Sequence, residues 1–217
     1  MFSYSDFQHV SLFQGLSLQE MEQLFQCLAP QVRTYPKGAV LFPLGETTQE
    51  MGLLLQGCLH LGKEDYWGNW SLLSQVEPGD LFGESYACAR EPLTVKVVAH
   101  QASQVLFFQV GRVLTNCPNA CPFHSRLIQN LLQVLARKNL QLSRKMDVVT
   151  QRTTRDKLLA YFSQLALEKG TNSFEIPFRR QQLADYLSVD RSAMTVELHK
   201  LAAQGILHLE KNHIQLL

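Results

Sequence analysis

Four apolar residues recur every seven positions in the second half of the chain: Ile128, Leu135, Leu142 and Val149. Leu131, Leu132 and Met146 fill adjacent positions. A strict seven-residue spacing is typical of a long helix with a coiled-coil seam. Because an isolated helix cannot bury such a seam by itself, we predict that it packs on its own chain and also pairs with a second copy. We assign this homodimer interface to Ile128, Leu131, Leu135, Leu142 and Val149.

Short apolar runs separated by glycines dominate residues 35–110. The glycines are Gly38, Gly45, Gly52, Gly57, Gly62, Gly68, Gly79 and Gly83. This texture predicts strands and turns, with strands at 53–55, 58–61, 72–73, 95–99 and 105–110 and a hairpin tip at 67–70. Many short strands favour a barrel or a sandwich. Before them, Ser17 and Glu20 form a capping-box pattern that predicts a short helix up to Leu28.

Helix and turn patterns fill the last third of the chain. Residues 153–169 predict a helix that ends before Gly170, and 174–177 form a short extended piece. A second helix follows at 180–187, and Ser188 and Val189 make a turn. Asp190 is the expected N-cap of a third helix that runs to Gln204, and residues 206–217 predict a hairpin. Two short helices with a tight turn, then a hairpin, predict a winged helix-turn-helix.

Charge and cysteine usage narrow the setting. Residues 1–115 hold six Lys and Arg against eleven Asp and Glu, while 116–217 hold fourteen against eight. The asymmetry favours a polyanionic partner for the second half, although chance solvated charges would give the same count. Five scattered cysteines show no disulfide framework or zinc-site spacing, and a redox role for Cys117 and Cys121 stays open. With no apolar run long enough to span a bilayer, we expect a cytoplasmic protein without a membrane partner.

The helix expected at residues 190–204 carries the candidate contacts to double-stranded DNA. It is the second helix of the predicted helix-turn-helix, and that helix enters the major groove. Its polar face lies opposite the apolar Met194, Leu198 and Leu201. The DNA-binding candidates are Arg191, Ser192, Thr195 and Val196, with Arg179 and Arg180 at the start of the preceding helix. A packed helical hairpin with solvated polar residues is the alternative that the pattern leaves open.

Several segments now form an ordered set: Tyr35-Pro36-Lys37-Gly38, Leu41-Phe42, Gly45-Glu46, Gln56-Gly57, residues 78–84, residues 183–193 and residues 204–207. The set resembles the regulator superfamily that contains the cyclic-AMP receptor protein and the fumarate-nitrate reductase regulator (CRP/FNR), over nearly the whole chain. The resemblance implies an α+β fold: a β-roll effector-sensing domain at 1–118, a dimerisation helix at 119–150 and a winged helix-turn-helix at 151–217.

The resemblance also implies a function. The chain would be a transcription regulator and not an enzyme, and it would bind a palindromic promoter site as a homodimer in response to a small-molecule effector. RNA polymerase would be a further partner. Relatives often carry an arginine where this chain has Val196, so their known operators should not be transferred.

Departures from the family pattern concern the effector. Nucleotide-binding members hold the ribose with a Glu, matched by Glu84, and the cyclic phosphate with a later Arg. That second position falls at Leu93 and Thr94, with Arg90 out of register, so a cyclic nucleotide is not expected. The first cysteine is Cys27, so the N-terminal ligands of an iron-sulfur cluster are missing. Haem held by His9, His100 or His124 stays open but is not favoured.

The effector therefore stays unknown. By analogy with the family, its pocket would lie between barrel and central helix and involve Glu84, Ser85, Leu93, Thr94, Asn139, Leu142 and Ser143. Two other functions compete with the regulator. One is a cupin-type metal-dependent enzyme using His60 and Glu64, although paired His-x-His ligands are missing. The other is a constitutive DNA-binding protein whose barrel is only structural.

Overall fold

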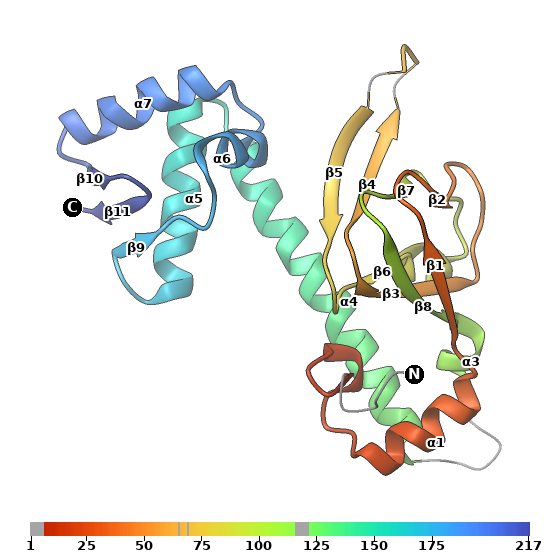
Figure 1. Ribbon diagram of the computed structural model, residues 1–217. Coiled ribbons are helices and arrows are strands. Elements are labelled where there is room, and N and C mark those ends of the chain that lie inside the picture. Colours follow the sequence, from red (N-terminus) through yellow and green to blue (C-terminus); the bar gives the residue numbers. More distant parts are fainter. Residues whose placement is uncertain (1–6, 65, 69, 116–121) are drawn as a thin grey trace. The chain divides into compact units, whose positions relative to one another are not determined.

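The computed structural model describes residues 7–64, 66–68, 70–115 and 122–217, and the chain divides into two compact units, 1–136 and 137–217. The described residues of the first unit form eight strands: β1 (Gln31–Tyr35), β2 (Val40–Phe42), β3 (Glu50–Gln56), β4 (Leu59–Glu64), β5 (Trp70–Val76), β6 (Leu81–Phe82), β7 (Lys96–Ala99) and β8 (Ser103–Gln109). They form two antiparallel four-stranded sheets, ordered β1-β8-β3-β6 and β2-β7-β4-β5. Of the two architectures that the strand pattern left open, a barrel or a sandwich, the structure has the sandwich (Figure 1).

The central strands β3 and β8 of one sheet are buried on both faces. Alternate residues of a strand point to opposite sides, so each strand contributes to two cores. In β8, Val105 and Phe107 enter the core between the two sheets, where they meet Phe42 and Leu59. Leu106 and Phe108 enter a second core on the outer side of the same sheet. This double burial explains why residues 105–108 of β8 are all apolar rather than alternating.

Helices cover that outer face. They are α1 (Leu18–Leu28), α3 (Val110–Leu114) and the start of α4 (Pro122–Val149). Ser17 and Glu20 cap α1 reciprocally, as their spacing predicts. From α4, Leu127 and Leu131 join the core, and the buried Asn130 amide donates to the carbonyls of Leu12 and Gln14 at 2.9 Å. The first part of α4 thus belongs to the N-terminal unit.

The second unit is a small helical domain with a three-stranded sheet. It contains α5 (Thr154–Lys169), β9 (Ser173–Glu175), α6 (Arg180–Leu187), α7 (Arg191–Ala203), β10 (Leu207–Glu210) and β11 (His213–Leu216). The sheet order is β10-β11-β9. Leu158, Phe162, Leu183, Met194 and Leu198 are fully buried in its core. The predicted winged helix-turn-helix is confirmed, with α6, α7 and the hairpin at their expected positions.

Some local expectations differ from the structure. The helix α2 (Glu84–Ala89) and the short η2 turn (Ser11–Phe13) had no sequence prediction. Val110 was expected to end a strand but begins α3. Residue Asn69 of the expected hairpin tip, Cys117, Cys121 and the expected boundary at 118/119 lie outside the described residues. No helix among the described residues is long and apolar enough to cross a bilayer.

Candidate nucleic-acid interface and ligand cavities

A tight turn joins α6 to α7 and sets the direction of α7. Ser188 has a left-handed backbone (φ 53°), and the Val189 N–H donates to the Ala184 carbonyl at 3.0 Å. The Lys157 ammonium, from α5, donates to the carbonyls of Leu187 and Ser188 at 3.1 and 3.3 Å. A cation at the C-terminus of a helix satisfies carbonyls that have no helical partner. Lys157 therefore fastens the turn to the core helix.

The start of α7 is capped by Asp190. Its carboxylate accepts from the Ala193 N–H at 2.8 Å and from the Ser192 hydroxyl. Both bonds lower the pKa of Asp190, and the bond from Ser192 has the larger effect. The cap is therefore charged at neutral pH. Just behind the cap, Arg191 and Ser192 are exposed, as is Val196, while Thr195 is half-buried. The expected candidates on α7 thus lie together on one helix outside the core.

The two arginines at the start of α6 have different surroundings. Arg179 is exposed, and its backbone N–H donates a hydrogen bond to the Gln182 side-chain oxygen. Arg180 is half-buried, and its guanidinium donates to the Lys211 carbonyl at 2.7 Å in the turn between β10 and β11. Its burial lowers the pKa of Arg180. Arg180 therefore anchors the wing turn, a role that the sequence pattern gave no means of foreseeing.

The residues expected around the effector are spread over both units. Glu84 and Leu93 are buried, with Leu93 in the core between the two sheets beside Phe42 and Val97. Ser85 and Thr94 are exposed, and Thr94 shares a 2.7 Å hydrogen bond with the Tyr86 hydroxyl. Asn139, Leu142 and Ser143 are exposed on α4, in the second unit. The pocket itself stays a prediction.

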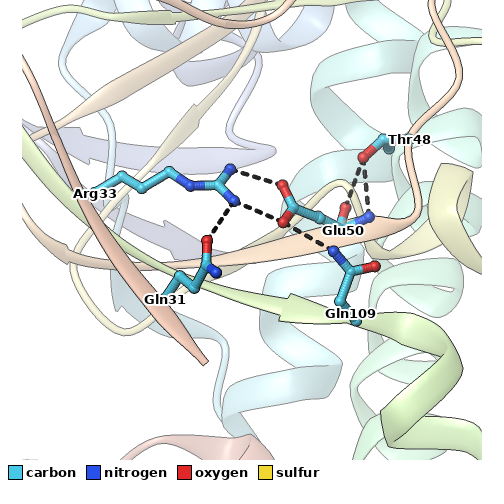
Figure 2. A network of polar contacts seen from close by, with 5 residues as sticks. All are labelled: Gln31, Arg33, Thr48, Glu50 and Gln109. Carbon is cyan, nitrogen blue, oxygen red and sulfur yellow. Dashed lines mark hydrogen bonds and ion pairs between the residues drawn. The ribbon is translucent and has the colours of Figure 1, made fainter. Parts of the chain in front are cut away.

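A polar cavity of about 350 Å³ lies elsewhere in the first unit, lined by Ala29, Gln31, Glu50, Phe107, Gln109 and Arg112. Figure 2 shows the network beside it: Arg33 donates twice to Glu50 at 2.7 Å and once to Gln31 at 3.0 Å. Gln109 also donates to Glu50 at 3.0 Å. These side chains provide hydrogen-bond partners for one another, so the main role of the network is to hold β1, β3 and β8 together.

The outward face of α4 is apolar. Leu132 and Leu142 are each 65% exposed and Met146 is 56% exposed, while Ile128, Leu135 and Val149 are half-buried. Leu131 is only 2% exposed because it belongs to the core of its own unit, so it offers almost no surface to a second copy. Leu132 and Met146 lie between the heptad positions 128, 135, 142 and 149, at spacings of three and four residues from them, as coiled-coil contacts do.

The cupin-type alternative finds no support. The ring of His60 stacks on His100 with centroids 4.0 Å apart, and Glu64 pairs with Lys96 at 3.5 Å. Within the described part of the chain, no group of three or more His, Cys, Asp or Glu side chains could hold a metal ion. The sequence leaves His9 and His124, like His100, open as possible haem ligands. His124 is buried with its Nε2 3.0 Å from the Val113 carbonyl oxygen, and His9 is exposed.

The stacked histidines predict a pH effect. Burial, and then the neighbouring His100, lower the pKa of His60 in the folded state. Below its unfolded pKa of about 6.5, the unfolded chain takes up this proton more readily, so stability falls as the pH drops. We expect His60→Gln to flatten the fall in unfolding free energy between pH 7.5 and 5.5, measured by urea titration. Parallel curves for wild type and variant would contradict this.

Two domain families match the chain. Residues 32–115 match the cyclic nucleotide-binding domain, and residues 156–217 match the Crp-like helix-turn-helix domain. A β-sandwich of the first kind followed by a winged helix of the second defines a DNA-binding transcription regulator. The chain thus has the two domains of CRP/FNR regulators in the same order and is homologous to them, as the sequence resemblance predicted.

Individual relatives agree with this assignment. The cyclic AMP receptor protein of Thermus thermophilus is 26% identical over 199 residues, covering 91% of this chain and 88% of the relative. A crystal structure of the Thermus thermophilus catabolite activator protein has a TM-score of 0.51 at 24% identity, covering 95% of this chain and 93% of that one. A structure of OCPA-complexed CprK has a TM-score of 0.64 at 15% identity and covers 91% of both chains.

Proposed function

We propose that this regulator acts in the cytoplasm as a homodimer, reads a palindromic promoter site through α7, and responds to a small-molecule effector that is not a cyclic nucleotide. The observation that carries the proposal is the exposed face of α7 behind the Asp190 cap, with Arg191 at its start. Two copies of α7 related by a two-fold axis would meet half-sites about one turn of DNA apart. RNA polymerase is the further partner that the family suggests.

The dimer is supported by the apolar face of α4. Leu132, Leu142 and Met146 lie on a helix of the protomer yet remain more than half exposed, which is costly unless a second apolar surface covers them. Asn139 is the one polar residue in the stripe formed by residues 128, 132, 135, 139, 142, 146 and 149. A single polar residue in a seam specifies register and pairing at some cost in stability.

The nature of the effector is supported by the interior of the sandwich. Leu93 is 2% exposed and packs with aromatic side chains, at the position where nucleotide-binding relatives place an arginine. An apolar side chain there provides no bidentate donor for a cyclic phosphate. The three-part domain division, 1–118, 119–150 and 151–217, belongs to the same proposal.

Replacing Arg191 tests the DNA-reading face. If its guanidinium bonds a guanine, Arg191→Ala should weaken binding by about 1 to 3 kcal/mol per half-site and relax preference at one base pair. If it contacts only phosphate, affinity should fall for all sequences and the salt dependence should flatten by about one unit per contact. Gel shifts on duplexes that the wild-type protein selects from a random pool, at two salt concentrations, separate these outcomes.

Lys37→Ala is the matched control, because it removes one exposed cation from the other unit and tests the effect of overall charge alone. It should leave affinity and base preference unchanged. Wild-type affinity, preference and salt slope in Arg191→Ala would show that α7 does not read DNA at this residue.

A further inference from the structure

The middle of α7 has an unusual surface for a helix that meets DNA. Val196 is 55% exposed, although Met194, Leu198 and Leu201 on the same helix are fully buried. Val196 therefore lies outside the hydrophobic core of the domain. A single exposed apolar residue is normal on a protein surface, so the side chains around it decide what this position can do.

The hydroxyl groups beside Val196 have already used their hydrogens. Thr195 donates its Oγ1 hydrogen to the Arg191 carbonyl at 2.8 Å, and Ser192 donates to the Asp190 carboxylate. Because a hydroxyl has one hydrogen and two lone pairs, each oxygen can still accept a bond. This part of the helix thus presents methyl groups and acceptors, and its hydroxyls cannot donate to a base.

The nearby carboxylate is also occupied. Glu197 pairs with Arg155 of α5 at 3.4 Å and with Lys200 at 3.6 Å, and its side chain is only 18% exposed. Two cations offset its charge, so it repels phosphate less. The next group available to a base beside Ser192 and Thr195 is therefore the apolar side chain of Val196.

From these contacts we infer that Val196 is a specificity-determining residue that reads the C5 methyl group of a pyrimidine in the major groove, supplied by thymine in unmodified DNA. This inference rests on the proposed entry of α7 into the groove. A T·A pair presents a methyl group together with the adenine amino group, a donor. Val196 matches the methyl group, and the hydroxyl oxygens of Ser192 or Thr195 match the donor. A G·C pair presents no methyl group, and its guanine edge needs donors.

The test uses the full-length protein and the duplex that it enriches most from a random pool. Each thymine of the half-site is replaced in turn by deoxyuridine, which removes only the methyl group. At one thymine, the loss should weaken binding about fourfold, and about fifteenfold when both half-sites are changed, as expected for one buried methyl group. In Val196→Ala, the same replacement should have almost no effect.

Leu167→Ala is the control variant, because Leu167 is an 84% exposed apolar residue on α5 and should keep full sensitivity to deoxyuridine. Equal sensitivity of wild type and Val196→Ala at every thymine would overturn the inference, even though DNA is still bound. Failure to enrich any sequence from the pool would instead contradict the proposed reading of DNA by α7, and this inference with it.

A final arm distinguishes the two sources of the methyl group. The sensitive T·A pair is replaced by a pair of 5-methylcytosine and guanine. Binding within about twofold of the original would support methyl reading with methylated cytosine as a second source. Loss of binding, together with the deoxyuridine effect, would support the inference with thymine as the source, because the adenine amino group is then also required.

Discussion

Leu142→Glu should convert the protein into monomers. Leu142 is 65% exposed in the protomer and belongs to neither buried core, so the change leaves both cores intact, but it would place two unpaired carboxylates in the proposed seam. An uncompensated buried charge costs about 3 to 5 kcal/mol, enough to raise the dissociation constant of the dimer more than about 100-fold. Light scattering at micromolar concentration measures the mass, and affinity for a palindromic duplex should fall with it.

Leu167→Glu is the matched control, because it makes the same chemical change at an 84% exposed leucine of the same unit, outside α4. It should remain dimeric. Leu135→Glu would be a less specific test, because Leu135 also packs against the core of its own unit and that variant would lose stability as well. An unchanged dimer in Leu142→Glu would remove this residue from the interface.

The second large effect is expected at Gly57. Its backbone has φ +99°, and a Cβ there would lie 2.3 Å from Ser103 Oγ and 2.6 Å from the Ala102 carbonyl oxygen. Ser103 is 3% exposed. Its hydroxyl accepts a hydrogen bond from the Cys58 N–H and lies within donating distance of the Cys58 carbonyl, so it cannot move away without losing buried hydrogen bonds. Gly57→Ala should combine backbone strain of about 1 to 2 kcal/mol with at least a similar loss from the displaced bonds.

Gly79→Ala separates the two contributions. Gly79 has nearly the same backbone angle, φ +94°, but a Cβ would meet nothing within 4 Å, so this variant should show the strain alone. Both tryptophans, Trp67 and Trp70, lie in the first unit. Tryptophan fluorescence during urea unfolding therefore reports on the unit that carries both changes. Equal loss of stability in the two variants would show that crowding at Gly57 has no effect.

Patterns with a local cause were predicted well from the sequence. Helix α6 and the Asp190 cap of α7 are set by neighbouring residues and by the spacing of Leu183, Leu187 and Met194. The glycines mark a limit of this reasoning. Gly57 and Gly79 lie in turns, but Gly52 lies inside β3, where a Cβ would fall 2.3 Å from the ring of Phe82. Sequence spacing does not distinguish a turn from the close approach of a neighbouring strand.

Long-range contacts account for what was missed. The heptad spacing found the apolar stripe of α4, yet Leu131 is buried against its own unit while Leu132, one position later, is 65% exposed. Only the placement of the sandwich decides which of the two faces inward. The ion pair of Arg33 and Glu50 and the bond from Arg180 to the wing turn also join residues far apart in sequence, which no local pattern could reveal.

The division of α4 between two cores determines where the chain can be split into independently expressed fragments. A fragment ending at residue 118 would lack Phe123, Leu127 and Leu131, all buried in the first unit, and a fragment starting at 151 would lack the fully buried Val148. Each would expose apolar surface and be prone to aggregate. Fragments that meet between Ala136 and Arg137, in the middle of the helix, keep both sets of buried side chains and are the ones to express separately.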